Sequence, residues 1–325
     1  MKQHILHIVP MIIGGLALFL YAITRLSAVL KTTFSDRVKT TIEKYTKNIF
    51  SSILIGMLIT IVLDSSSAVI IITIVFINAS TISFRNAIGI IMGANIGTTV
   101  SSQIIALDVA RFSIIPLVVG LVLFVFARKT NIQLTGKILL YFGMLFFGLF
   151  IIEESLLPLK NSDLFSNWME SIHNRPIRGS IIGGIMTLVI QSSSATIGMA
   201  IVLGKQQLIS INAGIAIMLG AELGTCSDTL IASINGSRQA IKAALFHLVF
   251  NLTGILIALA LFHPFVQLVR WITISESVDN HIANAHVLFS ILGVLLFLPF
   301  VGYFERLLNW MLPDKDMASP QHISD

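Results

Sequence analysis

The sequence carries little charge. Only 11% of its 325 residues are charged, whereas 55% are hydrophobic and the mean hydropathy is +0.89. Because a soluble domain has about 25% charged residues, this chain lacks the charge to coat soluble domains. Apolar runs also extend from end to end, which excludes a disordered chain or a soluble body with a single anchor. The composition predicts an all-α polytopic membrane protein in a lipid bilayer.

Several chemical signatures are also missing. Cys226 is the only cysteine, which excludes an intrachain disulfide and a cysteine-rich metal framework. The chain has no P-loop and no Gly-x-Ser-x-Gly elbow, so we expect neither direct ATP drive nor serine hydrolase chemistry. The net charge of +5 comes without a basic stripe interleaved with aromatics, so we expect no nucleic-acid partner. The expected protein is not an enzyme and has no cofactor.

The first half of the chain contains segments of unusual length. Residues 1–48 read as an apolar helix, too long for a signal peptide, followed by a basic helix at the membrane surface. Residues 49–157 begin with two short apolar runs around Asp64-Ser65-Ser66-Ser67, which indicate a re-entrant hairpin. A helix interrupted at Gly93–Thr99 and two spans, 112–127 and 138–157, complete this part.

The second half repeats the first. A polar connector at 158–179 precedes residues 180–304, and a short tail, 305–325, ends the chain. At an offset of 127, 52 consecutive positions align without a gap and 19 are identical. This identity indicates an internal duplication.

Three crossings separate equivalent points of the two copies, so the second copy is expected to be upside down. Each inverted-topology repeat would then hold a re-entrant helical hairpin and a broken transmembrane helix, as in secondary transporters. The same topology leaves 14 Lys and Arg inside and 7 outside. We therefore expect the N-terminus outside, the C-terminus in the cytoplasm, and a multi-pass protein of a bacterial inner membrane.

The polar centre of each copy is a serine cluster. In one isolated cluster, close helix packing would explain the serines equally well. Two clusters at opposed hairpin tips are different, because half-helices beginning at Ser66-Ser67 and Ser193-Ser194 present free N–H groups and positive dipole ends. Such ends suit a small oxyanion, and nearby carbonyl and hydroxyl oxygens suit Na⁺. The chemistry favours cation-coupled movement of a small anion.

These motifs carry a family resemblance. Gln191-Ser-Ser-Ser-Ala-Thr196, its degraded copy at Asp64–Val69, the glycine motif at Gly93–Thr99 and the segment Leu245–Asn251 resemble signatures of the type II sodium–phosphate cotransporters, over roughly residues 50–260. The resemblance implies a symporter that takes up inorganic phosphate with sodium ions as co-substrate. It implies phosphate binding by Ser65, Ser66, Ser192, Ser193, Thr98 and Thr225. It implies sodium binding by Gln191, Ser192, Thr225 and the position of Asp228, with Asn95, Ser67 and Ser194 in support.

Three carboxylates depart from the family pattern. Asp64 replaces a glutamine, Glu222 replaces an asparagine, and Asp228 stands among Thr and Ser positions. A carboxylate at bilayer depth costs around 3 kcal/mol, so we expect these residues to be paired, to bind Na⁺ or to exchange protons. His247 and Asn251 could also face the site, although packing explains them equally well.

Alternatives remain open at this point. The carboxylates are compatible with a proton-coupled transporter or with another small-anion substrate. The hairpins are compatible with an ion channel whose filter they form, or with a sensor that binds phosphate without moving it. Stoichiometry and oligomeric state are open, a homodimer being one option.

Overall fold

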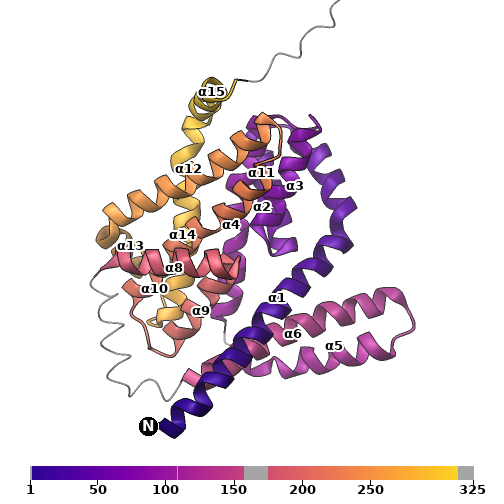
Figure 1. Cartoon of the computed structure of the whole chain (residues 1–325), viewed down its shortest axis with the longest axis vertical. Coiled ribbons are helices and arrows are strands. Elements are labelled where there is room, and N and C mark those ends of the chain that lie inside the picture. The colour runs from indigo at the N-terminus through magenta and orange to yellow at the C-terminus, as the bar shows by residue number, and fades with distance from the viewer. Residues whose placement is uncertain (1, 108, 157–174, 314–325) are drawn as a thin grey trace, which may run out of the picture.

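The structure is a computed structural model that describes residues 2–107, 109–156 and 175–313, with side chains from residue 9 onward (Figure 1). Within these ranges all regular structure is helical. The helices are α1 (Lys2–Tyr45), α2 (Ile49–Leu63), α3 (Ser66–Asn78), α4 (Phe84–Ala106), η1 (Ala110–Phe112), α5 (Ile114–Phe126), α6 (Thr130–Leu156), α8 (Pro176–Ile190), α9 (Ser193–Lys205), α10 (Ile211–Gly224), α11 (Cys226–Ser233), α12 (Arg238–Ala260), α13 (Phe262–Ile272), α14 (Val278–Phe297), η3 (Leu298–Phe300) and α15 (Val301–Met311).

Six helical stretches in the described part of the chain are long and apolar enough to cross a membrane. They lie at Val9–Tyr45, Phe84–Ala106, Thr130–Leu156, Ile211–Ser233, Arg238–Ala260 and Val278–Met311. This confirms the predicted polytopic membrane protein. Residues 158–174 of the predicted connector and residues 314–325 of the predicted tail lie outside the described residues.

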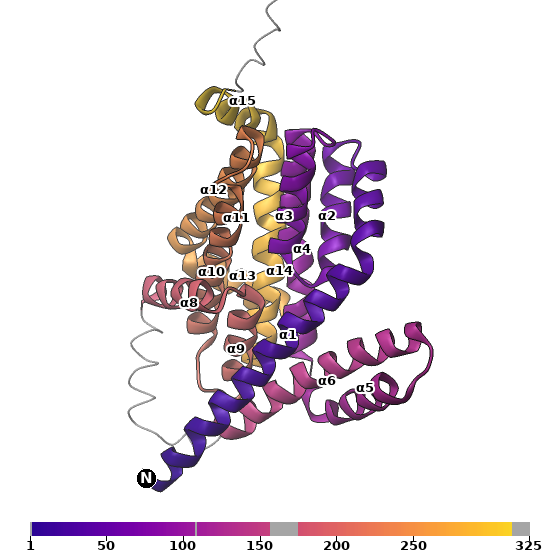
Figure 2. The ribbon, with the colours of Figure 1, turned by 45° about the vertical axis from the view of Figure 1, so that its right-hand side comes forward.

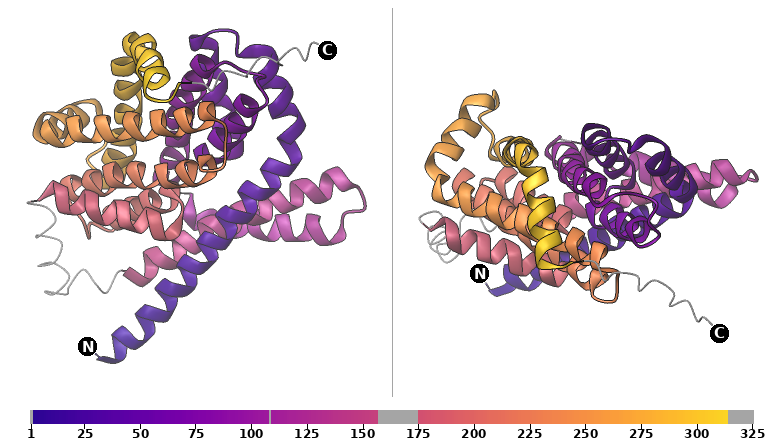
Figure 3. Two further views of the ribbon diagram at one scale, coloured as in Figure 1. Left: turned by 45° about the horizontal axis from the view of Figure 1, so that its top comes forward. Right: turned by 90° about the horizontal axis from the view of Figure 1, so that it is seen from above.

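The long helix α1 crosses the molecule diagonally and packs along α6 (Figures 1 and 2). Helix α5 folds back on α6, and together they form an arm that extends away from the other helices in both views of Figure 3. Six of the remaining helices form two packed groups. One group contains α2, α3 and α4, and the other contains α8, α9 and α10.

The two groups pack in the same way. In the first, a Cβ added at Gly93 of α4 would lie 1.9 Å from the carbonyl oxygen of Ile53 on α2. In the second, a Cβ added at Gly220 of α10 would lie 1.8 Å from the carbonyl oxygen of Ser180 on α8. Both pairs are related by the offset of 127, so the duplication seen in the sequence extends to individual backbone contacts.

The connections after α3 and α9 are also alike. Ser80 and Gln207, again 127 residues apart, have left-handed φ angles of 57° and 56°. The connection from α3 to α4 lies near the top of Figure 2, whereas the connection from α9 to α10 lies near the bottom of the helical body. Equivalent turns therefore occupy opposite ends of the molecule.

Two predictions about helix continuity are wrong. Helix α1 continues unbroken through residues 31–45, which we expected to form a separate surface helix, because no proline or glycine interrupts it there. Helix α4 runs unbroken through the expected break at Gly93–Thr99, since its glycines serve close contact with α2. Only the second copy is interrupted, at Thr225 between α10 and α11.

The expected span at 112–127 contains α5, which has 13 residues, and the helical segment Ala110–Phe126 is not among the six stretches long enough to cross a membrane by length and composition. Whether it crosses stays a prediction. It pairs with α6 through a tight connection and a close approach at Gly120, where an added Cβ would lie 2.2 Å from the backbone nitrogen of Leu140.

The glycine contacts allow a test of the packing. Gly93→Ala and Gly220→Ala should each lower the thermal unfolding midpoint of the purified protein in detergent, because a backbone carbonyl must move and overpacking costs about 1–3 kcal/mol or more. Gly302→Ala is the matched control, since nothing lies within 4 Å of its added Cβ. Unchanged midpoints for both test variants would contradict the described helix contact.

Candidate functional site

Each helical hairpin turns on a single residue in the left-handed backbone region. Asp64 ends α2 with φ 50° and ψ 37°, and Gln191 ends α8 with φ 57° and ψ 33°. The next residues are extended, with φ −160° and ψ 104° at Ser65 and φ −154° and ψ 110° at Ser192. The two tips thus share one backbone conformation. Aspartate tolerates the left-handed region better than most residues, which suits Asp64 to the first tip.

The serine that follows each turn caps the next helix. The Ser65 hydroxyl oxygen accepts from the Ala68 N–H at 3.2 Å, and the Ser192 hydroxyl oxygen accepts from the Ala195 N–H at 3.2 Å. The cap satisfies one of the four N–H groups that have no partner within the helix at its N-terminus. The first N–H groups of α3 and α9 remain available to a ligand, and they carry the positive ends of the helix dipoles.

Both tips open on one cavity of ≈ 370 Å³. Its polar lining includes Asp64 and Ser65 from the first tip and Gln191 and Ser192 from the second. A water molecule occupies about 30 Å³ of liquid, so the cavity has room for a small hydrated anion and a cation together. The two tips therefore line one cavity, as the duplicated motif led us to expect.

A third wall comes from α1. Thr24, Ser27 and Lys31 line the same cavity, at helical spacings of three and four residues. The Ser27 hydroxyl donates to the carbonyl oxygen of Leu63 at 3.4 Å, which ties α1 to the residue just before the first tip. The half-open cavity is therefore bounded by two duplicated tips and by one helix from outside the hairpins.

Two carboxylate–serine contacts flank the tips. The Ser101 hydroxyl of α4 donates to Asp64 Oδ1. The Ser67 hydroxyl of α3 donates to Asp228 Oδ2 of α11 at 3.0 Å, which joins the first tip to the second copy. Residues 64 and 191 are equivalent positions, and so are 101 and 228. Each copy thus has one carboxylate in this pair of positions. In the first copy it is at the tip, Asp64, and in the second it is at the other position, Asp228.

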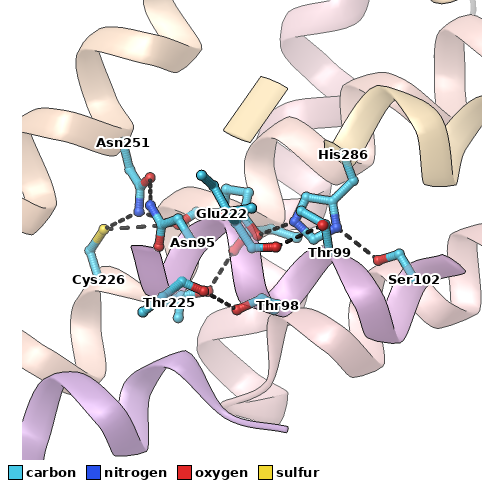
Figure 4. A network of polar contacts seen from close by, with 12 residues as sticks. Asn95, Thr98, Thr99, Ser102, Glu222, Thr225, Cys226, Asn251 and His286 are labelled. Atoms are coloured by element: carbon cyan, nitrogen blue, oxygen red, sulfur yellow. Dashed lines mark hydrogen bonds and ion pairs between the residues drawn. The ribbon is translucent and has the colours of Figure 1, made fainter. Parts of the chain in front are cut away.

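A second polar network is buried deeper among the helices (Figure 4). His286 of α14 donates from Nε2 to Glu222 Oε1 of α10 at 3.1 Å, and its Nδ1 lies 2.8 Å from the Ser102 hydroxyl of α4. His286, Glu222 and Ser102 are all buried. These two contacts of His286 join three helices that are far apart in the sequence.

A matching branch surrounds His247 of α12. The Thr229 hydroxyl lies 2.9 Å from His247 Nδ1 and donates to the Cys226 carbonyl, so it accepts from the Nδ1–H. Asn251 Nδ2 lies 3.0 Å from His247 Nε2, and Asn251 Oδ1 accepts from Asn95 Nδ2 at 2.8 Å. Neutral His247 satisfies both contacts.

The two branches obey the same duplication. Ser102 and Thr229 are equivalent positions, and each contacts the Nδ1 atom of a histidine. Asn95 and Glu222 are also equivalent. Glu222 contacts the histidine that Ser102 contacts, and Asn95 is linked through Asn251 to the histidine that Thr229 contacts. One branch holds a carboxyl group, Glu222, and the other holds an amide, Asn95. Asn251 and His247, which we considered as site residues, belong to this buried network.

The structure separates the expected site residues into groups. Asp64, Ser65, Gln191 and Ser192 line the cavity. Ser66, Ser193 and Ser194 are buried in the first turns of α3 and α9, behind the tips. The Thr98 and Thr225 hydroxyls donate to the carbonyl oxygens of Ala94 and Ala221 in their own helices, and neither threonine is among the lining residues.

Glu222, which we expected to bind or couple the cation at the tips, does not line the cavity. Glu222 and Asn95 are buried in the deeper network and are absent from the cavity lining, because histidine and asparagine partners from α12 and α14 engage them. Four of the residues around the site were not predicted from the sequence: Lys31, Ser27, Ser101 and His286. The polar stripe on α1 and the equivalence of Ser101 with Asp228 are the signals that could have revealed the first three.

Known proteins resemble this chain. A sequence model of the Na⁺/Pi-cotransporter family matches residues 18–154 and again residues 155–297, in agreement with the internal duplication. The protein YqeW of Bacillus subtilis, described as uncharacterized, is 29% identical over 215 residues, 66% of this chain and 70% of that protein. No solved structure matches the chain.

Two further relatives have functional names. A Salmonella typhimurium protein named as putative inorganic phosphate export protein YjbB is 21% identical over 274 residues, 84% of this chain and 49% of that protein. The human sodium-dependent phosphate transport protein 2B is 29% identical over 136 residues, 38% of this chain and 19% of that protein. The chain thus spans about half the length of the first and a fifth of the second.

The buried contact between Glu222 and His286 allows a test of its contribution to stability. Glu222→Ala should lower the thermal unfolding midpoint, since leaving the buried His286 Nε2–H without its acceptor costs about 1–3 kcal/mol. Removing both groups in Glu222→Leu with His286→Phe should cost less than the sum of the single changes. Glu276→Ala, at an exposed position, is the control. Additive effects would show that the two side chains are not coupled.

Proposed function

Because the chain belongs to the Na⁺/Pi-cotransporter family, we propose that it is a secondary active carrier that moves inorganic phosphate across a membrane together with sodium ions. The observation that carries this proposal is the single cavity bounded by both serine tips. Two helix N-termini directed at one space supply N–H donors and positive dipole ends to a small oxyanion. The phosphate would lie between Ser65-Ser66 and Ser192-Ser193.

Sodium would bind beside the phosphate. Asp64, Asp228 and the serine hydroxyls that contact them supply the hard oxygen ligands that alkali cations prefer, and Gln191 adds an amide oxygen on the cavity wall. A negative charge next to phosphate would repel it unless a cation lies between them. The carboxylates therefore favour binding of anion and cation together.

We further propose that the two copies are inserted in opposite directions and rock about the shared site. The equivalent packing of α2 with α4 and of α8 with α10 supports two rigid units, and the equivalent turns at opposite ends of the molecule support the inversion. The excess of Lys and Arg on one side favours an external N-terminus and a cytoplasmic C-terminus in a bacterial inner membrane.

Transport direction follows the sum of the sodium and phosphate gradients. An inward sodium gradient would drive uptake, whereas the YjbB relatives are named as export proteins. The same carboxylates suit a proton-coupled carrier, which is the main alternative to sodium coupling. The channel alternative has less support, because the family is one of cotransporters.

Uptake of radiolabelled phosphate into proteoliposomes tests the proposed function. Under an inward Na⁺ gradient uptake should be saturable, and an equal K⁺ gradient at the same pH should give none. A proton gradient without sodium is the third arm. Uptake driven by protons alone would replace sodium coupling, and absence of phosphate uptake under all gradients would refute phosphate transport.

The proposed role of Asp64 and Asp228 in cation binding has its own test. Asp64→Asn and Asp228→Asn keep the side-chain shape and a hydrogen-bond acceptor for serine but remove a charge. Each should raise the Na⁺ concentration for half-maximal uptake by about tenfold, the effect of losing about 1.4 kcal/mol of cation attraction. Asp36→Asn, at an exposed position of α1, should leave it unchanged. A wild-type Na⁺ dependence in both test variants would remove these residues from the cation site.

The inverted arrangement is tested by cysteine labelling. Ser80→Cys and Gln207→Cys place thiols at equivalent exposed turns, and the natural Cys226 is buried and should react little. In sealed vesicles of one orientation, an impermeant maleimide should label one variant from outside and the other only after permeabilisation. Labelling of both from the same side would contradict the inversion.

A further inference from the structure

The wall that α1 contributes to the cavity carries a full positive charge. Lys31 and Asp64 are the two charged residues among those that line this space. Thr24 and Ser27 precede Lys31 on the same lining, so the polar stripe of α1 ends in a lysine on the cavity that both tips share. Resting on the phosphate transport proposed above, we propose that Lys31 is the charged group of this chain that binds the substrate anion, and that α1 is the third binding element of the site.

The charge balance of the site supports this role. Phosphate near neutral pH carries between one and two negative charges, and each helix N-terminus offers a partial positive charge of about half a unit. Asp64 adds a negative charge to the same space. Lys31 is the group that offsets it, and an ammonium bonded to a phosphate oxygen is a charge-assisted hydrogen bond, stronger than one from a neutral donor.

The anchoring of α1 keeps this ammonium near the tips. Ser27 lies one helical turn before Lys31, and its bond to the Leu63 carbonyl holds that turn against the first tip. Helix α1 also contacts α9, the helix that begins at the second tip. These contacts fix the backbone of α1 beside the cavity, and the exposed side chain of Lys31 lines it.

Kinetics in proteoliposomes test the proposal. Lys31→Met should raise the KM for phosphate by about 10- to 100-fold, as expected for loss of a charged hydrogen bond, without a matching fall in the maximal rate. Lys31→Arg should stay within a few-fold of the wild type, because it retains the charge. Lys39→Met, at an exposed position two turns further along α1, is the matched control.

Restoring the charge separates this role from a structural one. Lys31→Cys, treated after purification with aminoethyl methanethiosulfonate, regains an ammonium of nearly lysine length and should regain a low KM. The neutral methyl reagent should not restore it, and phosphate should slow the modification. Buried Cys226 in the wild-type protein reports any background reaction.

The outcomes distinguish the two proposals. A KM within twofold of the wild type in Lys31→Met, or equal rescue of Lys31→Cys by the charged and neutral reagents, would overturn the role of Lys31 and leave phosphate transport standing. A wild-type protein that moves no phosphate under any gradient would overturn both.

Discussion

The site depends on a constraint that an apolar medium places on the backbone. Where a helix ends within the membrane, its N–H and C=O groups have no water to bond and must find other partners. At both tips a left-handed residue reverses the chain, and the following serine caps the next helix with its own hydroxyl. The cap leaves the first N–H groups of α3 and α9 available. These N–H groups are the donors that the proposed anion would use.

Because of the duplication this tip occurs twice, and the two copies differ in where their carboxylates lie. The packing of α2 on α4 matches that of α8 on α10 at the level of backbone contacts. Against that common frame, position 64 is aspartate where 191 is glutamine, and position 228 is aspartate where 101 is serine. The deeper network shows the same pattern, with Glu222 in one branch and Asn95 in the other. A symmetric scaffold thus carries an asymmetric set of carboxylates, as expected where one anion and its coupled cations occupy different places.

Local sequence signals predicted the hairpins well. Short apolar runs around Asp64-Ser65 placed α2 and α3 within a few residues of their bounds, because the apolar runs and the polar turn are all local features. Helix continuity was harder, since the glycines of α4 are explained only by their contact with α2. The partners of Glu222 could not be foreseen, because His286 lies 64 residues away on a helix whose position depends on the whole bundle.

The unbroken course of α1 connects the fold to the charge of the site. Had the helix ended near residue 30, as its composition implied, Lys31 would have begun a separate surface helix. Continuity instead fixes Lys31 one turn beyond Ser27, whose bond reaches the first tip. Because α1 also packs along α6 and contacts α9, a rocking motion of one copy against the other must shift α1 relative to at least one tip. The ammonium group would then move with respect to the bound anion as the site changes its exposure, so the affinity for phosphate would differ between the two sides of the membrane.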